Sequence, residues 1–438
     1  MSDQIPSTAE LKNQLENLKV CKGKLSRQIG DHKKNGMDFG DTVEEMKIIS
    51  TKIKSLENDI KLINKANLKK ETFQSPTLFP PHILELPYIS EKISSKKYHI
   101  TEVSNEMEDA WNQYINRHPA SNTYHSFYFK NIIEQSFGHK AYYFAAFNEN
   151  QTIVGIFPVI HTKSKLFGSY MTSVPYFNYG GPLSNNKAID QQLIQFANRY
   201  AIKFGVSHIE LRESTERNDL PCKSDKMSLF LTLPDSSEQL WQNIGTKVRA
   251  QVKKGLKNKF KFKIGKHELL EDFYRVFSIN MRDLGTPVYS KSFFYTILSS
   301  PLDAILAVQY HQGMPVSCAF LIAHKNCLEI PWASTLCKAN KLDSNMVLYW
   351  NILEYACNKG YDFFDFGRSS KDASTFKFKT QWGAEAAQLY WHYLLPDSQA
   401  LPNLNPNNPK FKFLIWCWKK LPLFIANTFG PLLARSLP

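Results

Sequence analysis

Apolar positions over residues 1–70 follow a pattern that the rest of the chain does not share. Leucine and isoleucine recur at alternating intervals of four and three residues over residues 11–29, with Lys22 in one of the apolar positions. Asn35-Gly36 interrupts the series, which resumes over residues 43–63. This spacing is typical of a coiled-coil seam, and Asn-Gly is typical of a turn. The pattern therefore predicts an antiparallel helical hairpin.

Prolines mark residues 71–97, which follow the predicted hairpin. They stand at Pro76, Pro80, Pro81 and Pro87. Because proline fixes its own backbone angle and has no amide hydrogen to donate, such a stretch disfavours both helix and sheet. We expect a linker, or a strap that docks on the folded part of the chain.

From residue 98 onward the apolar pattern is that of a mixed α/β protein, and one order of elements occurs twice. The first series has strands over 142–147 and 153–160, a helix over 191–204 and a strand over 208–212. The second has helices over 247–259 and 269–281, strands over 304–310 and 315–323, a helix over 345–359 and a strand over 361–366. The repeat predicts two lobes of one α/β (α+β) fold, over residues 98–235 and 236–396.

The tail, residues 397–438, becomes strongly amphipathic near its middle. Lysines alternate there with bulky apolar residues in the stretch 410–422. This composition suits an interfacial helix that lies on an anionic membrane. The same apolar residues would equally serve a helix that caps the second lobe.

Charge and cysteine content narrow the classes of function. The 438 residues carry a formal charge of +14, which favours a polyanionic partner such as nucleic acid, a phosphorylated donor or an anionic membrane. Seven cysteines without close pairs indicate neither a disulfide frame nor a zinc site. The polar N-terminus and the lack of a long apolar run predict a soluble, cytoplasmic protein, peripheral to the inner membrane if the tail binds lipid. No metal site is expected.

The hairpin carries a more specific pattern than a generic coiled coil. Lys24–Gly30, Lys33–Gly36 and the positions of Met46, Ser50, Ile53 and Leu56 resemble the tRNA-binding arm of seryl-tRNA synthetase. That resemblance implies contacts with tRNA phosphates. Their candidate donors are Lys22, Lys24, Arg27, Lys33 and Lys34. The alternative is an arm for protein contact or oligomerisation.

A second basic segment lies at the start of the predicted second lobe. Nine lysines and arginines from Lys247 to Lys266 occur with no acid among them, while apolar residues recur every four positions from Val248 to Phe260. One helix face therefore packs and the others present charge, which suits a pyrophosphate, a tRNA acceptor stem or a nucleotide-sugar. We take Lys247 and Arg249 as candidate substrate-binding residues. A solvated basic face is the alternative.

The most informative motif lies near the end of the second lobe. A strand that ends in Asp365-Phe366-Gly367 is followed by a loop, by Phe378-Lys379 and by Trp382-Gly383. This order resembles the FemAB family, whose members have two tandem lobes of the acetyltransferase (GNAT) fold. Family members transfer an amino acid from aminoacyl-tRNA to the peptide of a cell-wall precursor.

The resemblance is closer to FemAB-like proteins of exosortase and exopolysaccharide loci. It covers residues 99–438, and four segments carry it. They are residues 173–183, residues 280–289, residues 330–334, and the tail from Trp418 through Pro431.

Lys379 is the candidate catalytic residue on chemical grounds as well. Aminoacyl transfer from an ester needs an amine nucleophile and a positive group at the developing oxyanion, where the loss of one donor typically costs ~3 kcal/mol. Lys377 would share the same strand face, so the sequence leaves open which of the two lysines acts. A surface lysine on a strand is the alternative for both.

Further candidate residues surround these motifs. Arg368 is suited to a phosphate or carboxylate, or to an ion pair with Asp365. The other candidate substrate-binding residues are Tyr176, Asn178, Arg282, Asp365, Phe378 and Trp382.

Three functions fit these observations. The first is aminoacyl transfer from aminoacyl-tRNA to an amine of a cell-envelope peptide or exopolysaccharide precursor, which needs no cofactor. The second is an N-acyltransferase that uses acetyl-CoA or another acyl-CoA on an amino sugar, although neither lobe has a glycine-rich pyrophosphate loop. The third is a non-catalytic scaffold that binds tRNA or membrane. The acceptor, the amino acid and the oligomeric state stay open.

Overall fold

The computed structural model describes residues 8–35, 38, 40–71, 79–83, 98–164, 167–371, 373–395, 401 and 409–436. The chain divides into two units, Met1–Thr77 and Leu78–Pro438. The predicted linker lies largely outside the described residues.

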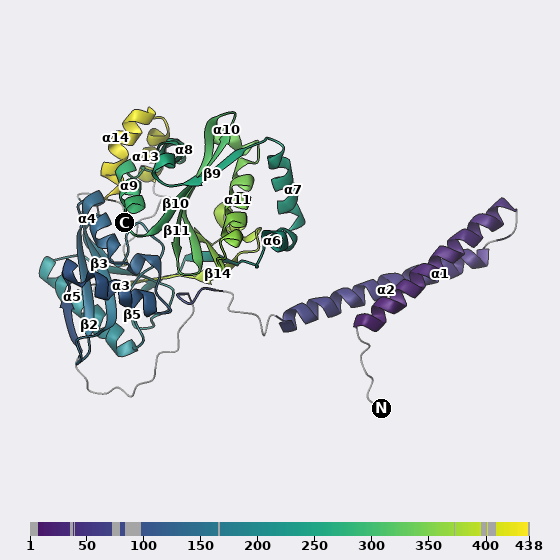
Figure 1. Cartoon of the computed structure of the whole chain (residues 1–438), viewed down its shortest axis with the longest axis horizontal. Helices are drawn as coiled ribbons and strands as arrows, with labels where there is room; N and C mark the ends of the chain where they lie inside the picture. Colours follow the sequence, from purple (N-terminus) through teal and green to yellow (C-terminus); the bar gives the residue numbers. More distant parts are fainter. Residues whose placement is uncertain are drawn as a thin grey trace. The chain divides into compact units, whose positions relative to one another are not determined.

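The first unit consists of two long helices (Figure 1). Helix α1 spans Thr8–Lys34 and α2 spans Gly40–Glu71, and the two pack against each other. The break falls at the predicted Asn35-Gly36 turn, and the amide of Gly40 donates to the side chain of Asp38 at 3.0 Å where α2 begins. Ile53 is buried in the seam.

The first sheet of the second unit has the strand order β1-β2-β3-β4-β6-β15-β7, with β5 paired to β3. Among the described strand pairings of this sheet, only that of β4 with β6 is parallel. Helix α5 lies between these two strands in the chain. The strands are β1 His99–Glu102, β2 Lys140–Phe147, β3 Ile153–Ser164, β4 Gly168–Thr172, β5 Leu183–Ser184, β6 Ile209–Glu213, β7 Cys222–Lys223 and β15 Tyr390–Leu394. The helices are α3 Glu108–Arg117, α4 Tyr128–Phe137 and α5 Lys187–Phe204, with 3₁₀ turns η1 Asn105–Met107 and η2 Thr123–His125.

The second sheet has the order β14-β8-β13-β12-β11-β10-β9. Here β12 and β13 form the parallel pair, and α11 connects them. The strands are β8 Lys226–Thr232, β9 Lys261–Gly265, β10 Asp303–His311, β11 Met314–His324, β12 Cys327–Thr335, β13 Phe363–Ser370 and β14 Glu385–Gln388. The helices are α6 Ser237–Asn243, α7 Thr246–Leu256, α8 Leu270–Leu284, α9 Lys291–Ser299, α10 Cys337–Asn340, α11 Ser344–Asn358 and α12 Ser374–Thr380, with the 3₁₀ turn η3 His267–Leu269.

Each sheet thus repeats one plan: antiparallel strands followed by a single parallel pair with a helical crossover. This agrees with the predicted tandem lobes. Two strands cross the predicted boundary, because β8 belongs to the second sheet and β15 belongs to the first. The two lobes are therefore interlocked by exchanged strands.

One element differs in type from the expectation. The alternation Phe376-Lys-Phe-Lys379 suggested a strand, but these residues form helix α12. Phe376 and Phe378 pack against the core of the second lobe, and Trp382 lies fully buried just beyond the helix. Packing of the partly buried Phe376 and Phe378 against the core, together with the full burial of Trp382, outweighs the local preference for strand.

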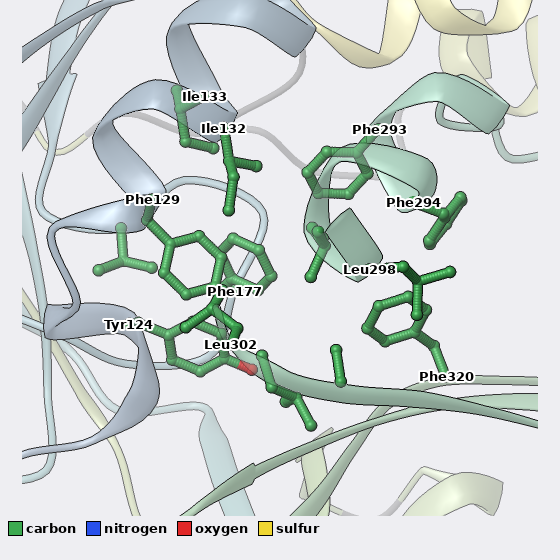
Figure 2. Packing of buried hydrophobic residues seen from close by; sticks show 14 of the residues in the cluster. Tyr124, Phe129, Ile132, Ile133, Phe177, Phe293, Phe294, Leu298, Leu302 and Phe320 are labelled. Atoms are coloured by element: carbon green, nitrogen blue, oxygen red, sulfur yellow. The ribbon is translucent and has the colours of Figure 1, made fainter. Parts of the chain in front are cut away.

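Aromatic side chains from both lobes form a shared core (Figure 2). Phe177 of the first lobe lies with its ring centre 5.7 Å from that of Trp332 in the second. Phe293 of α9 packs at 4.9 Å from Phe137 of α4. Such a continuous apolar core holds the lobes in one arrangement.

The tail forms two helices, α13 Pro409–Lys419 and α14 Leu423–Ala434, which pack against α8. Both contacts are close: a Cβ on Gly285 would lie 2.5 Å from Ile415, and a Cβ on Gly430 would lie 2.9 Å from Val288. The carbonyl of Arg435 also accepts a hydrogen bond from Tyr176 at 3.0 Å. The tail therefore caps the second lobe, as one of the two expectations had it.

The first prediction concerns the core of the first lobe. Trp111 is fully buried between Phe127 and Tyr143, and its indole N–H donates to the carbonyl of His125 at 2.8 Å. We expect Trp111→Ala to lower the free energy of unfolding by about 3–5 kcal/mol, measured by chemical denaturation. Trp416→Ala, at a side chain 58% exposed on α13, is the matched control and should change it by less than about 0.5 kcal/mol. Similar effects for both variants would contradict the assigned core.

Candidate functional site

Two carboxyl groups are buried side by side at the end of the parallel pair in the second sheet. Glu329 of β12 stands opposite Asp365 of β13 at the last paired position of the two strands. Each interrupts an otherwise apolar run, and their exposed fractions are 5% and 0%. A buried carboxylate is costly unless it is hydrogen-bonded or paired, so the partners of this pair define the site.

Those partners come from both lobes. Asp365 accepts hydrogen bonds from the Ser228 hydroxyl at 3.0 Å, from the amide of Gly367 at 2.7 Å and from the Tyr179 hydroxyl. Glu329 accepts from the side-chain amide of Asn178 at 2.7 Å. Burial raises the pKa of Asp365, and burial together with Asp365 raises that of Glu329 well above its usual range.

Lys379 lies beside this pair, on helix α12. Its ammonium donates to the carbonyls of Gly367 and Arg368, each at 2.9 Å, which leaves one N–H with no hydrogen bond to the residues that the structure describes. Burial lowers its pKa to about 8, and the nearby charge of Asp365 opposes that change. Lys377 is exposed, so the helix separates the two lysines that a strand would have placed on one face.

Strand β13 has a bulge at the residues whose carbonyls accept hydrogen bonds from Lys379. The register with β8 shifts between Asp365 and Arg368, and Gly367 has a φ of 71°. A Cβ at Gly367 would make an ordinary contact of 3.4 Å with the amide nitrogen of Asn178, so it is the backbone conformation rather than space that favours glycine. The bulge turns two carbonyls toward the ammonium.

Arg368 follows the bulge and makes no ion pair with Asp365 in the described part of the chain. Its guanidinium lies 5.1 Å from the ring centre of Trp391. The guanidinium of Arg212 lies 4.4 Å from the same ring centre. One terminal nitrogen of Arg368 is buried with no hydrogen-bond partner. Burial, with Arg212 nearby, lowers the pKa of Arg368 to about 10.

The structure thus brings Asn178, Asp365 and Lys379 together, with Arg368 adjacent to them in sequence. The other candidates serve different contacts. Tyr176 donates to the carbonyl of Arg435, and Arg249 donates to the carbonyls of Trp241, Gln242 and Ile244 at the end of α6. Arg282 pairs with Asp283 at 2.7 Å, Lys247 is exposed on α7, Phe378 packs against Tyr349, and Trp382 lies in the core.

The candidate tRNA-binding residues lie on α1. Lys24, Arg27 and Lys33 are exposed, and Lys22 is partly exposed. The side chain of Lys34 lies outside the described side chains. These positions leave the basic groups accessible to a polyanion, as the expectation requires, without testing it.

Sequence reasoning missed Glu329, Tyr124 and Ser228, and it placed Tyr179 in a candidate ligand-binding loop without predicting its contact with Asp365. Glu329 carried a usable signal, since it is a single acid inside an apolar strand, as Asp365 is in its own strand. The Tyr124 hydroxyl is buried near Glu329, and burial raises its pKa well above the usual range, with Glu329 adding to the shift. Tyr179 and Ser228 gave no local signal, because their contacts with Asp365 span 186 and 137 positions.

Two features are absent from the part of the chain that the structure describes. Among the described residues, no group of three or more metal-binding side chains is placed to hold an ion. No helix in the described ranges has the length and apolar character required to cross a membrane.

Residues 244–380 match the model of the acetyltransferase (GNAT) domain. No curated protein matches the chain. The crystal structure of FemX has 14% sequence identity and a TM-score of 0.51, covering 72% of this chain and all of its own, which shows a shared fold. L-PGS from Bacillus licheniformis has 13% identity, coverages of 73% and 98%, and a TM-score of 0.45. A tandem GNAT protein from the clavulanic acid biosynthesis pathway has 9% identity, coverages of 70% and 100%, and a TM-score of 0.44.

The lowered pKa of Lys379 makes stability depend on pH. The folded protein releases this proton near pH 8, whereas an unfolded lysine keeps it until about pH 10.5. The folded state therefore binds fewer protons in this window, and its stability rises with pH through it. Relative to Lys379→Met, the wild type should gain up to about 3 kcal/mol between pH 8 and 10.5, measured by denaturant unfolding. Parallel curves for the two proteins would contradict the buried ammonium.

Proposed function

We propose that this chain, an acyltransferase by its acetyltransferase (GNAT) domain, transfers an aminoacyl group from aminoacyl-tRNA to an amine of a cell-envelope peptide or exopolysaccharide precursor. The observation that carries the proposal is the buried ammonium of Lys379, fixed by two carbonyls beside the carboxyl pair. The resemblance of this motif to the FemAB family supports the same reaction.

The reaction needs little from the protein besides positioning and charge. The acceptor nitrogen forms a bond to the ester carbonyl carbon, the carbon–oxygen bond breaks, the amine loses a proton and the ribose hydroxyl gains one. Negative charge develops on the carbonyl oxygen, and the remaining N–H of Lys379 stabilises it. Asp365 contributes by raising the pKa of Lys379, which keeps the ammonium charged at neutral pH.

The start of α11 argues against acyl-CoA in the second lobe. A pyrophosphate binds at free backbone amides of a helix N-terminus, usually behind a glycine-rich loop. Residues 336–343 contain no glycine, and Asp343 at the helix start pairs with Lys254 at 2.8 Å. A carboxylate at this position repels phosphate.

The first lobe gives no better site for a pyrophosphate, despite Gly180-Gly181 ahead of α5. A Cβ on Gly180 would lie 2.1 Å from Val174, and one on Gly181 would lie 2.8 Å from Glu213. Packing against protein therefore explains both glycines. Acyl-CoA remains the second candidate donor because the chain matches the acetyltransferase (GNAT) domain. The contacts described above add no support for it.

Exposed lysines near α11 suit a larger polyanion. Lys253 on α7, Lys257 just after it, and Lys338 and Lys341 before α11 are all exposed, and α7 packs against α11. Phosphates of a tRNA acceptor stem match such a dispersed basic surface better than one compact pyrophosphate does. The lysines and the arginine of α1 give the arm a basic surface that also suits tRNA phosphates.

Transfer from charged tRNA is the direct test. The protein, retrieved from cell extract, should retain RNA enriched in one charged tRNA species, identified by sequencing, and should transfer its labelled amino acid to envelope precursors. Lys379→Met should lower the transfer rate ~10²–10³-fold while RNA retention stays unchanged, because one charge-stabilising donor is lost. Lys377→Met is the matched control and should behave as wild type.

Each alternative has its own outcome in that experiment. Absence of tRNA combined with acyl-CoA-dependent transfer would establish the second candidate reaction. tRNA retention with no transfer, unaffected by Lys379→Met, would indicate a scaffold. Loss of tRNA on removal of residues 1–70 would assign tRNA binding to the arm rather than to α7.

We also propose that the outer face of the tail binds an anionic membrane surface, where a lipid-linked acceptor would be met. Large apolar side chains are more than half exposed on α13 and α14. They are Phe413, Leu414, Trp416, Phe424, Phe429 and Leu432. Lys412, Lys419 and Lys420 are exposed beside them, and residues 398–438 include no acid. Aromatic residues mixed with lysines favour the interface of an anionic bilayer.

Vesicle sedimentation tests this surface. The protein should sediment with vesicles that contain phosphatidylglycerol and much less with pure phosphatidylcholine, because both charge and apolar area contribute. The double variant Trp416→Ser/Phe424→Ser should lose at least tenfold in binding. Ile202→Ser, at a side chain 74% exposed on α5, should leave binding unchanged. Equal losses for both would show that the tail is not the binding face.

A further inference from the structure

Residues 79–83, called the strap from here on, dock against both lobes. Phe79 and Ile83 belong to a small apolar cluster, whose other members are Tyr179, Phe230, Ala387 and Leu389. The amide of Ile83 donates to the carbonyl of Pro80 at 3.0 Å, which closes a turn inside the strap. The cluster draws on strands of both sheets, so the strap is fixed where the lobes meet.

His82 is the polar residue of the strap, and contacts on both its ring and its backbone fix its position. The ring stacks on Tyr179 with centres 5.2 Å apart, and it lies edge-on to Phe230 with centres 6.0 Å apart. The Ser214 hydroxyl donates to the His82 carbonyl at 2.9 Å. As a result, Nε2 of the ring lies 3.1 Å from the hydroxyl oxygen of Tyr179.

The direction of this hydrogen bond follows from the other partner of Tyr179. The Tyr179 hydroxyl donates its single hydrogen to Asp365, so its oxygen can only accept from Nε2 of His82. Burial raises the pKa of Tyr179 well above its usual range, so the hydroxyl keeps that hydrogen. Burial lowers the pKa of His82 to about 3, so the ring is a neutral donor at neutral pH. A hydroxyl that accepts one hydrogen bond donates the next one more strongly.

Asp365 passes this restraint on to Lys379. One oxygen of Asp365 accepts from the Tyr179 hydroxyl, and the other accepts from the Gly367 amide at 2.7 Å. The latter bond holds the bulge of β13, whose carbonyls at Gly367 and Arg368 accept from the ammonium. The nearby charge of Asp365 also raises the pKa of Lys379, against the effect of burial. Geometry and charge of the lysine thus both depend on this carboxylate.

We infer that His82 is a positioning residue for Lys379, which it supports from the strap through Tyr179 and Asp365. By donating to the Tyr179 hydroxyl, it aims that hydroxyl at Asp365, and Asp365 holds the bulge and the ammonium. The inference rests on the proposed function for the role of Lys379 in transfer, and on these contacts alone for the support of its charge. A segment that precedes the first lobe thereby becomes part of the site.

The other charged and titratable groups decide what a pH series can report. Asp365 and Glu329 favour the charged form of Lys379, and Arg368 opposes it. The groups that face His82 are His125, His324 and Lys325. Burial lowers the pKa of these two imidazoles to about 3 and about 4, so none of the three rings changes charge above about pH 6. Comparison with Lys379→Met in the same background cancels any contribution of Lys325.

Full-length variants at position 82 test the inference. His82→Phe keeps a flat ring on Tyr179 and removes the N–H, whereas His82→Gln keeps an N–H donor. His82→Leu repeats the first change with a second apolar side chain, in case His82→Phe does not fold. The matched control is His208→Phe, because the His208 ring also stacks on a tyrosine, Tyr170, with centres 5.4 Å apart, and bonds to Ser207.

The first measurement needs no substrate. Denaturant unfolding gives the pH at which each background gains stability over its own Lys379→Met variant, which is near pH 8 for the wild type. In His82→Phe this onset should move down by at least about half a pH unit, because a less supported Asp365 lets Lys379 lose its proton sooner. His82→Gln and His208→Phe should keep the wild-type onset.

The second measurement is aminoacyl transfer. His82→Phe should lower kcat about three- to tenfold at neutral pH and leave the KM for tRNA unchanged, because one hydrogen bond behind the lysine is lost. The double variant His82→Phe/Tyr179→Phe should be no slower than Tyr179→Phe alone, since His82 acts only through that hydroxyl. His82→Gln should restore most of the rate.

Three results would overturn the inference: an unchanged onset in whichever apolar variant folds, an equal shift in His82→Gln, or additive losses in the double variant. The onset is measured without tRNA or acceptor, so it decides the inference even where no aminoacyl transfer is found. A shifted onset without transfer would keep His82 as the support of Lys379 and reject the proposed function.

Discussion

Burial of two carboxyl groups and one ammonium in a common interior is the constraint on which the rest of the second unit depends. Glu329 and Asp365 end a parallel strand pair, where adjacent strands place their side chains together. Neither group would be stable there without donors, because desolvation of a charge costs more than one hydrogen bond returns. The first lobe supplies Tyr179 and Asn178, and the second supplies Ser228 and the amide of Gly367. The site therefore exists only while both lobes are in contact.

The interlocked sheets explain how that contact is kept. Strand β15 returns from the end of the second lobe to the first sheet, and β8 leaves the first lobe to join the second. On β15, His392 completes the hydrogen bonds of Glu213, and the Tyr393 hydroxyl donates to Glu210 at 2.8 Å. With the aromatic core between α4 and α9, these contacts make separation of the lobes expensive.

The sequence predicted the larger elements because their apolar periods are strong. Helices α5, α8 and α11 and strands β2, β3, β10 and β11 lie within a few residues of the expected ranges. It failed at α12, where Phe and Lys alternate as in a strand, since the decisive burial of Phe376, Phe378 and Trp382 is tertiary. Arg249 was placed with the substrate because charge in a basic run is visible in sequence, while three carbonyl acceptors at the end of α6 are not. Asp365 and Lys379 were found through a motif, yet Tyr179 reaches Asp365 across 186 positions.

One series of contacts connects the first lobe to Lys379 of the second. A polar cavity of the first lobe is lined by Tyr179, Glu213 and Arg217, and Glu213 pairs with Arg217 and accepts from His392. The Tyr179 hydroxyl also donates to Asp365. Asp365 in turn raises the pKa of Lys379, so its charge supports the ammonium. The charge of a lysine in the second lobe is thus coupled to a hydroxyl that the first lobe supplies.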